Sequence, residues 1–159
     1  MMAAVSVFGQ SGKATTVKTT FHRKTSVSID INAELPVIWA LLTNAPGYPG
    51  WNSTIISIDG KIALGEKIRL KSTLDTTRTF KLKVKEFEPE TKLVWGDGQG
   101  RRTYTLIKRG NGSTTFSMTE RIGGLMFPMY AKMIPSFDQS FEQFASDLKK
   151  ESENKQNIN

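Results

Sequence analysis

Apolar and polar residues alternate with a period of two over most of the chain between residues 20 and 124. The alternation is cleanest in KIRLKSTL, where Ile68, Leu70 and Leu74 share one face and basic residues occupy the other. A period of two is typical of a β-strand with one buried face. Turn signals such as Asn111-Gly112 separate the runs and indicate antiparallel pairing. About seven strands are predicted, at 20–31, 55–58, 67–74, 78–88, 92–98, 101–110 and 113–124.

Helical spacing appears in two regions. NAELPVIWALLTN, after the first strand, predicts a helix with Asn32 as N-cap, followed by a Pro-Gly-rich turn or very short helix. In residues 125–153 apolar residues recur every three or four positions. Pro135 divides this region into a short apolar piece and a main helix with Pro135 in its first turn. The predicted fold class is α+β, a curved antiparallel sheet wrapped around a long C-terminal helix, with one or two short helices after the first strand.

The length of 159 residues predicts a single domain. Residues 1–16 lack the features of a signal peptide, so we expect a flexible tail there. One domain is expected over 17–153 and a C-terminal tail over 154–159. The absence of cysteine excludes disulfides and thiolate catalysis and fits a cytoplasmic protein. With His22 as the single histidine, no metal or other cofactor is expected.

The net charge is +7, and part of it gathers on two neighbouring strands. Alternation places six basic residues on the outward face there: Lys67, Arg69, Lys71, Lys81, Lys83 and Lys85. A solvated sheet face is the simplest interpretation. Nucleic acid is an unlikely partner, because no aromatic residues interleave with these cations for base stacking. Transient contact with an anionic membrane is a further candidate interaction.

Several phrases resemble a known group of proteins: INAELPVIWALLTN, the YPGWN of 48–52, ISIDGKIALGEKI, FEPETKLVWGDG and IPSFDQSFEQFASDLKKESE. The chain resembles the SRPBCC superfamily, which contains START lipid-transfer domains, birch-pollen allergens and polyketide cyclases, and within it the small bacterial polyketide cyclase/dehydrase-like branch. The resemblance covers 17–153. It implies a helix-grip fold with a cavity for a lipid, hormone or polyketide. Relatives often carry a histidine where this chain has Arg102, so histidine-dependent chemistry does not carry over.

Alternation also places Arg102 and Glu120 on the inward faces of neighbouring strands. One hypothesis is that they form an ion pair at one end of the cavity, where Arg102 binds a ligand carboxylate, phosphate or carbonyl. The alternative is that both lie at strand ends and reach solvent. We predict eight further ligand-binding residues, for which ordinary core packing is the alternative: Trp95, Tyr104, Phe116, Met118, Phe80, Tyr130, Met133 and Phe137.

Two polar residues near the start of the domain are expected to lie exposed, Arg23 at the sheet edge and His22 beside it. No catalytic residue is assigned. The methionine-rich piece that follows Gly123-Gly124 is a candidate gate over the cavity.

The leading functional prediction is binding or carriage of a small hydrophobic or amphipathic molecule, lipid-like or polyketide-like, in this cavity. A polyketide cyclase or aromatase-type enzyme is the alternative, and a protein-interaction module is a third. The sequence leaves the enzymatic activity, the ligand and the oligomeric state open.

Overall fold

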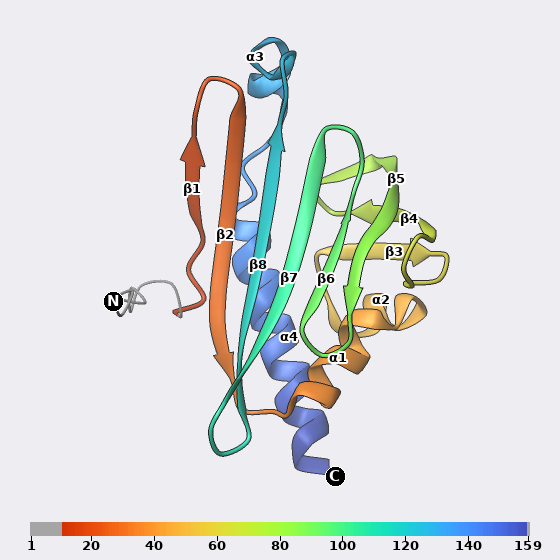
Figure 1. Cartoon of the computed structure of the whole chain (residues 1–159), viewed down its shortest axis with the longest axis vertical. Coiled ribbons are helices and arrows are strands. Elements are labelled where there is room, and N and C mark those ends of the chain that lie inside the picture. The colour runs from red at the N-terminus through yellow and green to blue at the C-terminus, as the bar shows by residue number, and fades with distance from the viewer. Residues whose placement is uncertain (1–10, 159) are drawn as a thin grey trace.

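Within residues 11–158, the part of the chain that the computed structural model describes, one antiparallel sheet of eight strands curves around a long C-terminal helix (Figure 1). The order across the sheet is β1-β2-β8-β7-β6-β5-β4-β3. The strands are β1 Thr15–Lys18, β2 His22–Ile31, β3 Ile55–Asp59, β4 Lys67–Ser72, β5 Asp75–Glu88, β6 Lys92–Gly96, β7 Gly100–Arg109 and β8 Ser113–Gly123.

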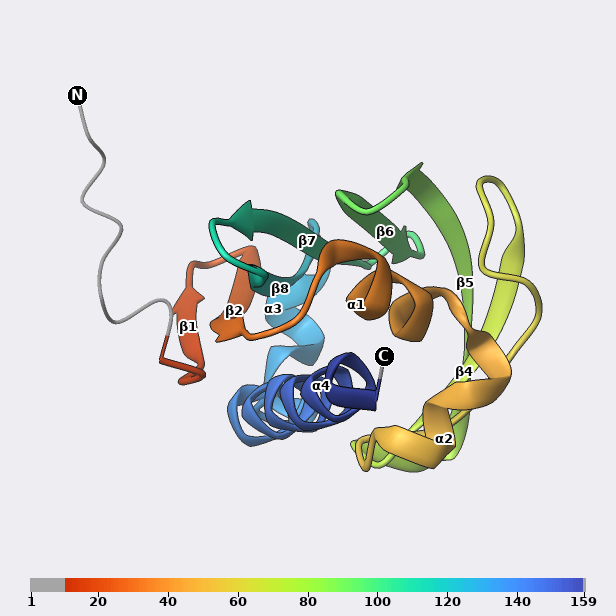
Figure 2. The ribbon, with the colours of Figure 1, turned by 90° about the horizontal axis from the view of Figure 1, so that it is seen from below.

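The helices lie at two points of the chain. They are α1 Leu35–Thr43, η2 Ala45–Gly47 and α2 Tyr48–Trp51 after β2, and α3 Phe127–Tyr130, η3 Ala131–Met133 and α4 Asp138–Ile158 after β8. Figure 2 shows the sheet bent into an open curve, with α4 and α1 inside it. This confirms the predicted helix-grip architecture. None of the helices in residues 11–158 combines the length and the apolar character needed to cross a membrane.

The predicted strand count misses β1, whose first two residues lie in the segment expected to be a flexible tail. β1 pairs with β2 from Thr15↔Ser26 to Lys18↔Arg23. The first turns of α4 hold this edge, because Glu142 Oε1 accepts a hydrogen bond of 3.0 Å from the Ala14 N–H. A four-residue edge strand has too little alternation to be recognised from sequence. Residues 1–10 of the expected tail lie outside the described part of the chain.

Two expectations about helix ends are wrong for one reason. Asn32 does not cap α1, whose N-cap position is Glu34, and residues 154–158 are helical rather than a tail. The Asn32 N–H donates to Glu153 Oε2, and the Glu34 N–H donates to Gln156 Oε1, each at 3.0 Å. The last turns of α4 therefore satisfy the backbone donors of the β2–α1 junction.

The beginning of α4 also differs from the expectation. The helix starts at Asp138, so Pro135 precedes it instead of occupying its first turn. Ile134, the C-cap of η3, has an extended conformation with ψ of 121°, as the residue before a proline prefers. We call residues 134–137, between η3 and α4, the linker. Because α4 begins only at Asp138, the linker rather than the helix faces the end of the sheet that is uppermost in Figure 1.

Candidate ligand-binding cavity

A cavity of about 200 Å³ lies between the linker and the strands β4 to β8. Its apolar lining comes from Leu70, Leu74, Phe80, Leu82, Trp95 and Ile122 on the sheet and from Met133, Ile134, Pro135 and Phe137 on the other side. Its polar lining comes from Ser72, Asp75, Arg78, Asp97, Gln99, Arg102 and Glu120. The strand residues line it because inward-facing positions recur with a period of two, and the linker closes it because α4 begins only at Asp138.

The polar centre of the cavity is the ion pair between Arg102 and Glu120. The two residues are directly opposed on β7 and β8. Arg102 Nε and Nη2 donate to Glu120 Oε2 at 3.1 and 2.7 Å, and the side chains are only 12% and 18% exposed. The predicted ion pair is therefore confirmed, and the alternative of two solvent-reaching strand ends is wrong. Although burial opposes the charge, the Glu120 carboxylate holds the pKa of Arg102 above its ordinary value.

The ion pair uses only part of its hydrogen-bonding capacity. Among residues 11–158, no hydrogen bond of good geometry uses Arg102 Nη1 or Glu120 Oε1, although the Tyr104 hydroxyl lies close enough to the Arg102 guanidinium to interact with it. One can donate and the other can accept. The charged residues of the lining are two cations and three carboxylates. The cavity thus offers a donor and an acceptor on a pair that is neutral overall, which suits an uncharged polar group better than an anion.

Six of the ten predicted ligand-binding residues line the cavity: Arg102, Glu120, Trp95, Phe80, Met133 and Phe137. The other four do not. Tyr104, Phe116 and Met118 are buried in the core, and Tyr104 and Phe116 both pack against Phe144 of α4. Tyr130 contacts Phe127 on α3, away from the cavity. Inward alternation is the same for the strand residues that line the cavity and for those in the core. It therefore does not predict which of them α4 covers.

Tyr104 lies next to the cavity's polar centre without lining it. Its hydroxyl is buried and makes no hydrogen bond of good geometry among the described residues. Burial raises the pKa of Tyr104 to about 12, and the neighbouring positive charge of Arg102 acts in the opposite direction. The hydroxyl is therefore a neutral, unpartnered group immediately behind the ion pair.

Arg23 is the clearest error of the sequence analysis, because it is buried rather than exposed. Its Nη1 and Nη2 donate to the carbonyl oxygens of Ile134 and Pro135 at 3.2 and 2.8 Å. Its guanidinium also lies 4.6 Å from the ring centroid of Phe137. Burial lowers the pKa of Arg23, with Glu120 and Asp138 opposing that shift. Arg23 thus fixes the linker to β2 and so fixes one wall of the cavity.

Of the twelve cavity residues that the sequence did not predict, seven lie on strands and five come from turns and from the linker. Asp97 and Gln99 lie between β6 and β7, and Ile134 and Pro135 belong to the linker. Arg78 had a recognisable signal in the sequence, because it lies two residues before Phe80 and so shares its inward face. In the structure its guanidinium is 4.7 Å from the centroid of the Phe80 ring. His22, expected to be exposed, is half-buried beside Gly123. Residues 11–158 contain no cluster of three metal-ligating side chains.

The predicted gate has one conformational feature that fits a hinge. Gly124 has a φ of 136°, which side-chain-bearing residues rarely adopt, and its N–H donates to the Phe21 carbonyl at 3.0 Å. The gate itself stays a prediction.

Comparison with known proteins identifies the fold. No protein-family model and no curated protein matches the sequence. Among solved structures, a START superfamily protein from Mycobacterium smegmatis superposes with a TM-score of 0.61 and 16% identity, over 82% of this chain and 97% of that one. The fold is START-like. A conserved protein of unknown function from Enterococcus faecalis gives a TM-score of 0.63 at 14% identity, over 87% and 75% of the two chains.

The START-like fold extends to a protein in the dynemicin biosynthetic locus, DynU16. It gives a TM-score of 0.62 at 16% identity and covers 84% of this chain. This chain spans about half of DynU16, 48% of its length. The fold implied by the sequence resemblance is therefore confirmed. At such low identities these likenesses concern the fold alone, and they assign no ligand.

Proposed function

We propose that the protein binds a small amphipathic molecule in the cavity between the linker and the sheet. The observation that carries this proposal is a half-satisfied ion pair in a cavity that also has an extensive apolar lining. The apolar part of the ligand packs against Phe80, Leu82 and Trp95. An uncharged headgroup such as a hydroxyl or an amide accepts from Arg102 Nη1 and donates to Glu120 Oε1, whereas a carbonyl only accepts from Arg102.

The expectation from sequence is that Arg102 binds a ligand carboxylate, phosphate or carbonyl, and of these the ion pair favours the uncharged one. Glu120 already neutralises Arg102, so an anionic headgroup would have to displace it or leave a carboxylate buried nearby. Separating a buried charge from its partner costs several kcal/mol, roughly 3 to 5. A neutral headgroup avoids that cost. The START-like fold supports small-molecule binding in general terms, since it places a long helix against a curved sheet.

Size sets a further limit on the ligand. The cavity volume of about 200 Å³ is below the roughly 300–1,000 Å³ typical of ligand sites. A short amphipathic molecule fits, and a longer one would extend past Met133, which lines the cavity and is 83% exposed.

Trp95 provides a direct measurement, because it lines the cavity and its fluorescence responds to a bound molecule. We would titrate the purified protein with nonanamide and with nonanoate, which share an apolar chain and differ in headgroup charge. We expect the neutral amide to bind at least about tenfold more tightly, a difference of about 1.4 kcal/mol. Equal or tighter binding of nonanoate would contradict the proposal.

Two variants sharpen this test. Arg102→Met combined with Glu120→Leu keeps the volume of the pair and removes its polarity, so the preference for the amide should disappear. Lys108→Gln, an exposed change at the far end of β7, is the matched control and should retain it. Native mass spectrometry of freshly purified protein would then identify any natural ligand.

A cyclase or aromatase-type activity is the second candidate. The observation that favours it is Glu120 Oε1, a carboxylate oxygen without a partner in a cavity that can hold a polyketide fragment. The likeness to DynU16, from the dynemicin biosynthetic locus, also gives a reason to test polyketide-like substrates. Turnover that is lost in Glu120→Gln, with binding retained, would support this activity over simple carriage.

A further inference from the structure

Five basic side chains form a row across the outer face of the sheet, opposite the face that α4 covers. Residues directly opposed on neighbouring strands point to the same face of a sheet. The row crosses six neighbouring strands in the spatial order β2, β8, β7, β6, β5 and β4. Each strand contributes one basic residue except β6, which contributes Gly96. The row runs Lys24↔Arg121, Arg121↔Arg101, Arg101↔Gly96, Gly96↔Lys83 and Lys83↔Lys67. We call the five basic residues the cationic row; all five are exposed.

The cationic row is electrostatically unfavourable in the isolated protein. Like charges directly opposite each other destabilise a sheet, and Lys24–Arg121, Arg121–Arg101 and Lys83–Lys67 are such pairs. Within residues 11–158, the ion pairs involve Lys92, Arg102, Lys149 and Lys155, so no member of the row is neutralised by a carboxylate. A fourth like-charged pair, Arg69↔Lys81, lies two residues beyond the row on β4 and β5. An anionic partner would remove this repulsion.

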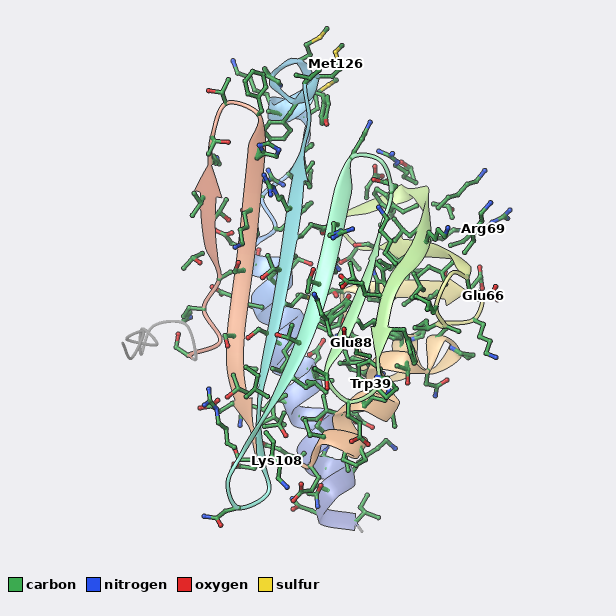
Figure 3. All side chains as sticks on the ribbon, viewed as in Figure 1. Trp39, Glu66, Arg69, Glu88, Lys108 and Met126 are labelled. Atoms are coloured by element: carbon green, nitrogen blue, oxygen red, sulfur yellow. The ribbon has the colours of Figure 1, made fainter. Side chains whose placement is uncertain are left out.

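An exposed apolar tip adjoins one end of the cationic row. Leu125, Met126 and Met129 are 88%, 59% and 76% exposed, and Phe21 joins them because its carbonyl accepts from the Gly124 N–H. We call these four residues the apolar tip, and Figure 3 shows Met126 at the extremity of the molecule. Arg121 and Gly124 are three residues apart, about 10 Å along an extended chain at roughly 3.3 Å per residue. Apolar and cationic groups are thus arranged in adjacent bands.

We propose that the apolar tip and the cationic row form a docking surface for a lipid bilayer that contains anionic lipids. The tip enters the boundary between headgroups and acyl chains, and the nearer cations, Lys24, Arg121 and Arg101, contact the anionic headgroups. The exposed leucine and methionines of the apolar tip match the acyl-chain boundary of a bilayer. The unpaired cations of the cationic row match its anionic headgroups. Docking in this orientation places Met133, where the cavity meets the surface, close to the membrane.

Other occupants fit the observations less well. A nucleic acid would use the cations but not the apolar tip, and no aromatic side chain stands in the row for base stacking. A second copy of the chain would cover the apolar tip but would bring two cationic rows together. The bilayer uses both features. This surface is independent of what the cavity binds, so its test stands or fails separately from the proposed function.

The test is co-sedimentation of the full chain with vesicles of phosphatidylcholine alone and of phosphatidylcholine mixed with phosphatidylserine. We expect binding to the mixed vesicles only, weakening as salt rises. The row variant, Lys24→Gln with Arg101→Gln and Arg121→Gln, should bind about a hundredfold more weakly, since each cation near the surface contributes roughly a fivefold factor. The tip variant, Leu125→Ser with Met129→Ser, should lose at least about tenfold, because its apolar area no longer leaves water.

The matched control is Lys108→Gln with Lys150→Gln and Lys155→Gln, which removes the same charge at the opposite end of the molecule, where Figure 3 labels Lys108. It should bind nearly as well as the unmodified chain. Every substituted side chain is exposed, and thermal unfolding checks that the variants are folded. The proposal is overturned by failure of the unmodified chain to bind mixed vesicles at low salt, or by equal losses in the row and control variants. It is also overturned by unchanged binding of the tip variant or by tighter binding of an oligonucleotide to the same row.

Discussion

The interface that α4 and the linker form with the sheet has aromatic residues at both ends. One end is filled by side chains, and the other contains the cavity. At the lower end, Phe144 packs against Tyr48, Trp51, Tyr104 and Phe116, with ring centroids 5.7 to 6.3 Å away. The space there is filled by side chains. At the other end, Phe137 of the linker and Phe141 of α4, seven and three residues before Phe144, stack on each other at 5.9 Å, and a cavity lies beside Phe137.

Charge explains the difference between the two ends. At the upper end the aromatic pair lies between two guanidinium groups, with Arg23 on Phe137 and Arg102 on Phe141, at 4.6 and 5.0 Å from the ring centroids. These groups need hydrogen-bond acceptors at fixed positions, Glu120 for one and the linker carbonyls for the other. Directional bonds hold the walls apart where apolar side chains would have closed on each other. The buried charges therefore keep the cavity open.

The largest test of this comparison is the removal of one phenylalanine from each end. Phe144→Ala should lower the free energy of unfolding by about 4 kcal/mol, because it leaves a hole in a filled core. Phe137→Ala should cost less than half of that, because its side chain already borders empty space. Urea unfolding measures both. Equal losses would mean that the two ends are packed alike.

The second test breaks the ion pair. Glu120→Ala leaves Arg102 charged and without a partner, so we expect a loss of about 3 kcal/mol in unfolding free energy. The double change Arg102→Met with Glu120→Leu removes both charges and should fall within about 1 kcal/mol of the unmodified chain. If the double variant is as unstable as the single one, the pair contributes packing rather than charge balance.

The third test concerns the anchor of the linker. Arg23→Met removes the hydrogen bonds to the Ile134 and Pro135 carbonyls, so we expect a loss of about 2 kcal/mol. Amide hydrogen exchange should rise in residues 131–137 and little elsewhere. Arg121→Met, an exposed change on the outer face of β8, is the control. Unchanged exchange in the linker would show that other contacts hold the cavity wall.

The smallest effect is a pH dependence. The Tyr104 pKa is raised to about 12 in the folded chain, while an unfolded tyrosine titrates near 10. The folded state therefore holds its proton more tightly, and stability is lost as pH rises from about 10 towards 12. Near pH 11 the loss should be about 1 kcal/mol. Tyr104→Phe should remove that part and change stability little at neutral pH, because the Tyr104 hydroxyl makes no hydrogen bond of good geometry among the described residues. An equal alkaline loss in both proteins would assign the effect to other groups.

Much of the sheet and part of the cavity could be predicted because their signals are local. The Asn111-Gly112 turn sets the register of β7 and β8, and Arg102 and Glu120 each lie nine residues from Asn111. Burial of Arg23 could not be predicted in this way. It depends on linker carbonyls 111 and 112 residues away. Tyr104 and Trp95 have the same inward alternation, and only the position of α4 separates core from cavity lining.

The contacts between α4 and the β2–α1 junction have a consequence for how the chain folds. Glu153 and Gln156 reach backbone N–H groups 121 and 122 residues earlier, and β2 pairs with β8 over its whole length. The N-terminal edge of the sheet therefore has no permanent partner until almost the entire chain has been synthesised. Such distant contacts slow folding, because long loops must close first. On the ribosome, β2 would wait for β8, Ser113–Gly123, and the β2–α1 junction would wait for the last turns of α4.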